Sequence, residues 1–196
     1  MAKIKKKRVS IGFSYNSPVI LTFAILSLAV LLLGTLTDGK STGLLFSVYR
    51  FRPTDVLGYL RLFLHVLGHS NWEHFFANVG LLLVVGPLVE EKYGSKSVLV
   101  SIAATALVTG ILHIIISPGT ALLGASGIVF MLILMASITN FRSGYIPLTL
   151  IVVALIYIGS EIYNGIIVAD DISQLTHIAG GVMGIVCGII FSKHRL

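Results

Sequence analysis

The chain has 196 residues, of which 56% are apolar and 11% charged, and it carries a net charge of +6. Soluble domains average about 45–50% apolar and about 25% charged residues, and a spanning helix takes about 20 residues, so one compact membrane domain fits and a separate soluble domain is excluded. The basic residues are spread along an apolar chain as topology signals are, which argues against a nucleic-acid-binding surface.

The first long apolar run, Val19 to Leu36, follows a basic N-terminal tail of residues 1–17. The run is longer than a signal-peptide core, no small-x-small cleavage site precedes Asp38, and further apolar runs follow. These features predict a retained first span, with the tail as a solvated, cytoplasmic topology signal.

A long connection, Thr37 to His74, mixes apolar residues with arginines, so part of it is expected to lie in the membrane interface as an amphipathic helix. Within it, His65 and His69 stand four residues apart, and together with His74 they suggest a metal site. No carboxylate or cysteine completes a recognised ligand set, so we expect no metal here. We expect His65 and His69 to brace the loop by hydrogen bonds.

Five further apolar runs follow, at Phe75–Val89, Val98–Ile116, Ala121–Phe141, Ile146–Val168 and Ile172–Phe191. They predict an all-α membrane protein, a six-transmembrane-helix bundle whose single membrane domain covers residues 18–192 and is followed by a short cytoplasmic tail, residues 193–196. Lys and Arg are more numerous on the side that holds both termini, so the positive-inside rule predicts cytoplasmic termini.

Polar side chains gather near the outer ends of the second, fourth and sixth predicted spans, all of which run from outside to inside. His74 and Asn78 open the second span, and Ser126 and His177 lie about five residues into the fourth and sixth. Ser126 and His177 are therefore expected at nearly the same depth. Polar residues are costly at membrane depth, so each one is a candidate functional residue.

These residue types suit acyl transfer. A serine hydroxyl becomes a nucleophile when an adjacent imidazole takes its proton, which assigns those roles to Ser126 and His177. The resulting oxyanion needs hydrogen-bond donors, and His74 and Asn78, spaced i and i+4, share one helix face. Taken singly, Ser126 is most simply a packing serine and His177 a satisfied bundle histidine, but their common depth favours the catalytic interpretation.

Glycines recur on the helix face that carries His177, at Gly180, Gly184 and Gly188. Small residues repeated on one face let membrane helices approach closely. We therefore expect the fourth and sixth spans to pack tightly enough to bring Ser126 and His177 within hydrogen-bond reach.

Four segments carry a family resemblance: Arg61 to Asn78, Gly86 to Gly94, Gly124 to Gly127, and His177 to Gly184. In order and spacing they resemble the rhomboid intramembrane serine proteases. The resemblance implies cleavage, without a cofactor, of the transmembrane segments of single-span membrane proteins in the lipid bilayer.

The resemblance also implies residue roles: Ser126 as nucleophile, His177 as general base and acid, and His74, Asn78 and the Ser126 backbone N–H as oxyanion donors. It favours a structural role for Glu90, capping a neighbouring loop. The chain departs from the family pattern at Phe130, where a tyrosine is frequent. It departs again at Gly86-Pro87, where a Gly-Gly pair is frequent.

A different class remains open: a small-solute transporter or channel whose polar outer-leaflet site binds a ligand. Many transporters are built from inverted repeats, and the sequence shows no such symmetry, which weakens this alternative. A catalytically dead relative is disfavoured because both Ser126 and His177 are present.

We expect a multi-pass protein of a prokaryotic plasma membrane that cleaves near the extracytoplasmic side. His113 is expected to be a packed or backbone-bonded histidine.

Overall fold

The computed structural model describes residues 15–141 and 171–193, together with isolated positions between 148 and 159. Over these residues the secondary structure is helical: α1 (Pro18–Leu36), α2 (Lys40–Leu45), α3 (Val56–Leu64), the 3-10 turn η1 (His65–Leu67), α4 (Trp72–Tyr93), α5 (Ser95–Ile116), α6 (Ser126–Phe141) and α8 (Asp171–Lys193). Across this part of the chain, β pairing is limited to one isolated bridge, between Val48 and Leu122. The protein is therefore an all-helical bundle, as the apolar runs predicted.

Within the described residues, four helices are long and apolar enough to cross a membrane: Pro18–Leu36, Trp72–Tyr93, Ser95–Ile116 and Leu175–Ser192. The helix that follows Ala125 is apolar but shorter, over Ser126–Ile138. The fifth predicted span, Ile146–Val168, falls outside the described residues apart from the isolated positions. The count of six spans therefore stays a prediction.

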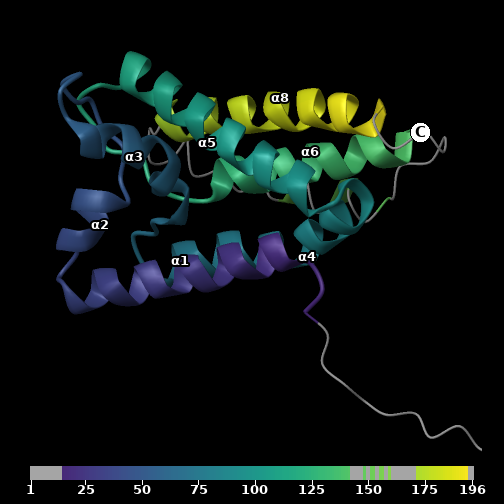
Figure 1. The fold of residues 1–196 in the computed structure, drawn as a ribbon, viewed down its shortest axis with the longest axis horizontal. Helices are drawn as coiled ribbons and strands as arrows, with labels where there is room; N and C mark the ends of the chain where they lie inside the picture. Colours follow the sequence, from purple (N-terminus) through teal and green to yellow (C-terminus); the bar gives the residue numbers. More distant parts are fainter. Residues whose placement is uncertain are drawn as a thin grey trace, which may run out of the picture.

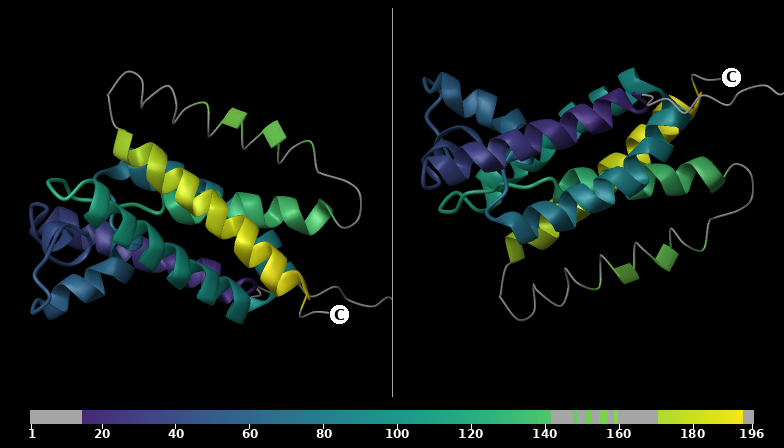
Figure 2. Two further views of the ribbon diagram at one scale, coloured as in Figure 1. Left: turned by 90° about the horizontal axis from the view of Figure 1, so that it is seen from above. Right: turned by 90° about the horizontal axis from the view of Figure 1, so that it is seen from below.

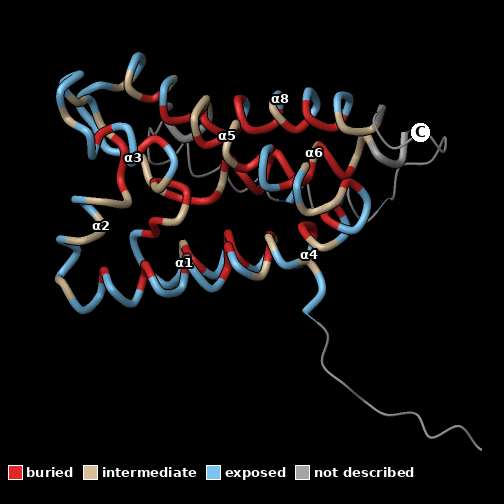
Figure 3. The backbone as a smooth tube through the Cα atoms, viewed as in Figure 1, coloured by how far each residue is buried: buried red, intermediate tan, exposed pale blue. Residues whose placement is uncertain are grey.

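Helix α6 occupies the middle of the bundle. It packs on α4, α5 and α8, while α1 packs on α4 at the edge (Figure 1). Seen from above, α8 runs obliquely across α6 (Figure 2). The buried positions gather where the helices face one another (Figure 3). Several α6 side chains, including Ile128, Met131 and Leu132, have no exposed surface. An all-round apolar helix is stable in this central place because every face meets protein.

A buried carboxylate joins α4 to the start of α1. Glu90 accepts hydrogen bonds from the backbone N–H groups of Val19 and Ile20, each at 3.0 Å. The first N–H groups of a helix have no intrahelical acceptor, and a carboxylate there also suits the helix dipole. The structural role expected for Glu90 is confirmed, although the element that it caps is helix α1 rather than a loop.

The connection between α1 and α4 contains the expected amphipathic helix. On α3, Val56, Tyr59 and Leu60 are exposed, while Leu62 and Arg61 are buried. The Arg61 guanidinium pairs with the Asp55 carboxylate and lies over the ring of Tyr49. The amphipathic character of this helix is confirmed, and its place in the membrane interface stays a prediction.

Candidate active site

Ser126 is the first residue of α6. The N–H of Val129 donates to the carbonyl of Ala125 at 2.9 Å, so Ala125 caps the helix and Ser126 opens it. Gly124 has a φ of 128°, a conformation that side chains rarely adopt. The helix thus begins five residues later than the predicted boundary at Ala121, because the chain before Ser126 is extended and paired with another segment.

That pairing comes from the long connection between α1 and α4. The N–H of Val48 donates to the carbonyl of Leu122 at 2.9 Å, and the N–H of Leu122 donates back at 2.8 Å. The N–H of Gly124 donates to the carbonyl of His65 at 3.0 Å. The long connection therefore fixes the backbone leading into Ser126. The sequence carries no local signal for this contact.

Two glycines of α8, Gly180 and Gly184, meet α6 backbone to backbone, whereas Gly188 meets the Ile138 side chain. A methyl group added to Gly180 would lie 2.2 Å from the carbonyl oxygen of Gly127, and one added to Gly184 would lie 2.3 Å from that of Met131. One added to Gly188 would lie 3.3 Å from Ile138. The predicted close approach of the two helices is confirmed.

His177 of α8 contacts α6 about one turn after Ser126. Its side chain is buried and stacks on Phe130, with ring centroids 4.7 Å apart and planes at 12°. Phe130 lies about one turn beyond Ser126 on the same helix. Phe130 thus keeps an aromatic surface for the imidazole, although it lacks the hydroxyl of the tyrosine expected from the resemblance.

His74, near the start of α4, lies against the segment that precedes Ser126. Asn71 caps this helix, since its side-chain oxygen accepts from the His74 N–H at 2.8 Å. The Cε1 and Nε2 atoms of His74 lie so close to Gly124 that a Cβ there would be 2.9 Å from each. Gly124 is therefore required both by its φ and by the imidazole.

Asn78 lies one turn further along α4. It is buried, and its Nδ2 donates to the carbonyl of His74 at 2.9 Å. Of the four predicted site residues, His74 thus lies against Gly124, just before Ser126, and His177 lies against Phe130, about one turn after it. Asn78 sits deeper in α4, which itself packs on α6.

The two loop histidines brace the backbone, as expected. The Nε2–H of His65 donates to the carbonyl of Ala106 at 3.1 Å, and the Nδ1–H of His69 to that of Leu67 at 3.1 Å. Burial lowers the pKa of each to about 4, so both are neutral at physiological pH. No group of three or more His, Cys, Asp or Glu side chains that could hold a metal occurs within the described ranges.

His113 also bonds the backbone, through a contact of 3.0 Å from its Nε2 to the carbonyl of Thr120. This confirms its expected structural role. It ties the end of α5 to the connection that leads into α6.

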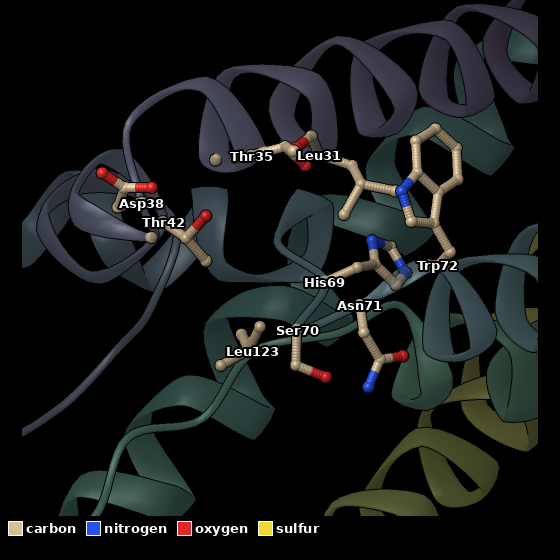
Figure 4. A pocket seen from close by; sticks show the side chains of 11 residues that line it. Leu31, Thr35, Asp38, Thr42, His69, Ser70, Asn71, Trp72 and Leu123 are labelled. Atoms are coloured by element: carbon tan, nitrogen blue, oxygen red, sulfur yellow. The ribbon is translucent and has the colours of Figure 1, made fainter.

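A hollow of about 320 Å³ lies beside His69, between the end of α1 and the start of α4 (Figure 4). Its lining is Leu31, Gly34, Thr35, Asp38, Gly39, Thr42, His69, Ser70, Asn71, Trp72 and Leu123. The hollow joins residues far apart in the sequence, so sequence reasoning missed it.

Comparison with known proteins decides the family. The model of the Rhomboid domain family matches residues 57–194. The chain belongs to the rhomboid family. It is also 24% identical over 158 residues to Rhomboid protease GlpG of Haemophilus influenzae, a match covering 76% of this chain and 77% of that protein. With its apolar helices, this rhomboid protein is a multi-pass integral membrane protein of an intramembrane protease family.

Proposed function

We propose that this rhomboid protein is a serine-type intramembrane endopeptidase with a Ser126–His177 dyad. The observation that carries the proposal is the stack of His177 on Phe130. Together with the backbone contact of Gly180 with Gly127, it supports an imidazole about one helical turn from Ser126, the residue that opens α6. Family membership favours this function over a solute transporter or channel.

The chemistry follows from that arrangement. The Ser126 Oγ attacks the scissile carbonyl while an imidazole nitrogen of His177 takes its proton. When the tetrahedral intermediate collapses, His177 returns the proton to the leaving amine and the acyl group stays on Ser126. Water, deprotonated by His177, then hydrolyses the ester and frees the enzyme.

Three donors are proposed for the oxyanion. The backbone N–H of Ser126 lies in the first turn of α6, where N–H groups have no intrahelical acceptor and the helix dipole favours negative charge. The His74 imidazole borders Gly124, just before Ser126 in the chain. Asn78 would join them if its amide turned from the His74 carbonyl toward the substrate.

The substrates proposed are single-span membrane proteins, cut in or next to their transmembrane segments near the extracytoplasmic side. A membrane helix satisfies all its backbone groups internally, so it must unwind before its amide can reach Ser126. Substrates should therefore carry small or helix-weakening residues near the cut. The catalytic unit is the membrane domain of residues 18–192, placed in a prokaryotic plasma membrane with cytoplasmic termini.

The decisive experiment incubates the purified protein in detergent with a panel of single-span substrates and reads the fragments by mass. A fluorophosphonate probe should label Ser126, and labelling should require His177. Folded protein that cleaves nothing and takes no probe would overturn the proposal. So would cleavage by a folded Ser126→Ala variant.

A further inference from the structure

Ser70 stands in the turn before α4, next to the imidazole of His74. Its Oγ lies 3.2 Å from the Nδ1 of His74. The Cε1–Nε2 edge of the same ring faces Gly124. The two ring nitrogens thus meet different surroundings: a hydroxyl on one side and the backbone leading into Ser126 on the other.

This difference matters because a neutral imidazole carries one N–H and one bare nitrogen. An oxyanion at Ser126 needs a donor, and the nitrogen on that side of the ring is Nε2. His74 can serve only if the proton is on Nε2, which leaves Nδ1 as an acceptor. A serine hydroxyl can donate to it.

We propose that Ser70 is a positioning residue: its hydroxyl donates to Nδ1 of His74 and so holds the proton on Nε2, toward the oxyanion. This inference rests on the proposed function, in which His74 is an oxyanion donor. His69 supports the arrangement by packing edge-on against the ring, with centroids 5.1 Å apart. Its own Nδ1–H is used on Leu67, so His69 supplies shape while Ser70 supplies the hydrogen bond.

The kinetic test compares Ser70→Ala with Ser70→Thr. Losing one hydrogen bond should lower kcat about three- to tenfold in the alanine variant, whereas threonine keeps the hydroxyl and should stay within about twofold of the parent. The same Ser70→Ala change in a His74→Ala background should have no further effect, because Ser70 acts through His74. An equal loss in both backgrounds would overturn the proposal.

The spectroscopic test reads the tautomer directly, from the imidazole ¹⁵N shifts of histidine-labelled protein in detergent. The parent should show His74 protonated on Nε2, and Ser70→Ala should raise the share protonated on Nδ1. Thr35→Ala is the matched control. Thr35 and Ser70 both line the hollow beside His69, but the Thr35 hydroxyl donates to the Leu31 carbonyl. A spectrum that Ser70→Ala leaves unchanged would overturn the proposal.

The two hypotheses can fail separately. If His74→Ala cleaves at the parental rate, the oxyanion role of His74 is wrong. A tautomer shift in Ser70→Ala would still support the hydrogen bond assigned here. If His74→Ala is impaired and the tautomer does not respond to Ser70, the oxyanion role stands and the role of Ser70 is wrong.

Discussion

The two sides of the candidate active site are held by different forces. On the α8 side, glycine contacts let the backbones of α6 and α8 touch, and His177 is set by stacking on Phe130. On the loop side, hydrogen bonds hold the backbone before Ser126, through Val48 and His65.

The difference predicts how each side fails. Close-packed backbones cannot absorb an added methyl group without moving a helix, so the α8 side should be sterically intolerant. A single hydrogen bond contributes only about 0.5–1.5 kcal/mol net, so the loop side should lose function in steps. Its buried neutral histidines should also make it sensitive to acid.

The largest effect tests the chemistry that both sides serve. Ser126→Ala and His177→Ala should each reduce cleavage to background while the protein stays folded, and the double variant should be no worse, because nucleophile and base act as a unit. Fragment yield and thermal stability in the same detergent are the measurements. Turnover by a folded Ser126→Ala protein would refute the dyad.

The oxyanion donors should give the next largest effect. His74→Ala and Asn78→Ala should each lower kcat about 10²- to 10³-fold, because the Ser126 N–H remains. Probe labelling of Ser126 should persist in both. Parental rates in both variants would leave these residues with a structural role only.

The packing side is tested by Gly184→Val, which should lower cleavage about 10²-fold although it touches no catalytic atom. Met183→Val should be mild. Gly181→Ala is a sharper control, because among the described residues a methyl group there would meet only Leu134, at 3.8 Å. Equal activity in the Gly184 and Met183 variants would show that the glycine contacts do not set the position of His177.

The smallest effect concerns acid. The pKa of His65 falls to about 4 in the folded protein from an ordinary value of 6.5, so below pH 6.5 the unfolded chain binds more protons than the folded one. The contribution of His65 to the free energy of unfolding is therefore fully present above pH 6.5. It is lost as the pH falls toward 4, by about 2 kcal/mol between pH 7 and 5. The melting temperature should drop over that range, and His65→Gln should reduce the drop. An unchanged drop would assign it to other groups.

Much of this protein was predictable from local features. Long apolar runs predicted the spanning helices, because the lipid core demands length and hydropathy whatever the neighbours are. The spacing of Gly180, Gly184 and Gly188 predicted the close approach of α6 and α8, because helix geometry alone puts these residues on one face. Buried polar residues are costly in lipid and stand out in an apolar sequence. This predicted the candidate site residues Ser126, His177, His74 and Asn78.

Other features depended on which segments the fold brings together. The sequence could not show that α6 begins at Ser126, because the residues before it are apolar and become extended only by pairing with Val48. Nor could it show that Glu90 caps α1, or that the Nε2 edge of His74 faces Gly124. Each is a contact between groups far apart in the chain. Apolar runs and motif spacing specify which helices form, whereas the partners of individual polar atoms are decided only when those helices pack.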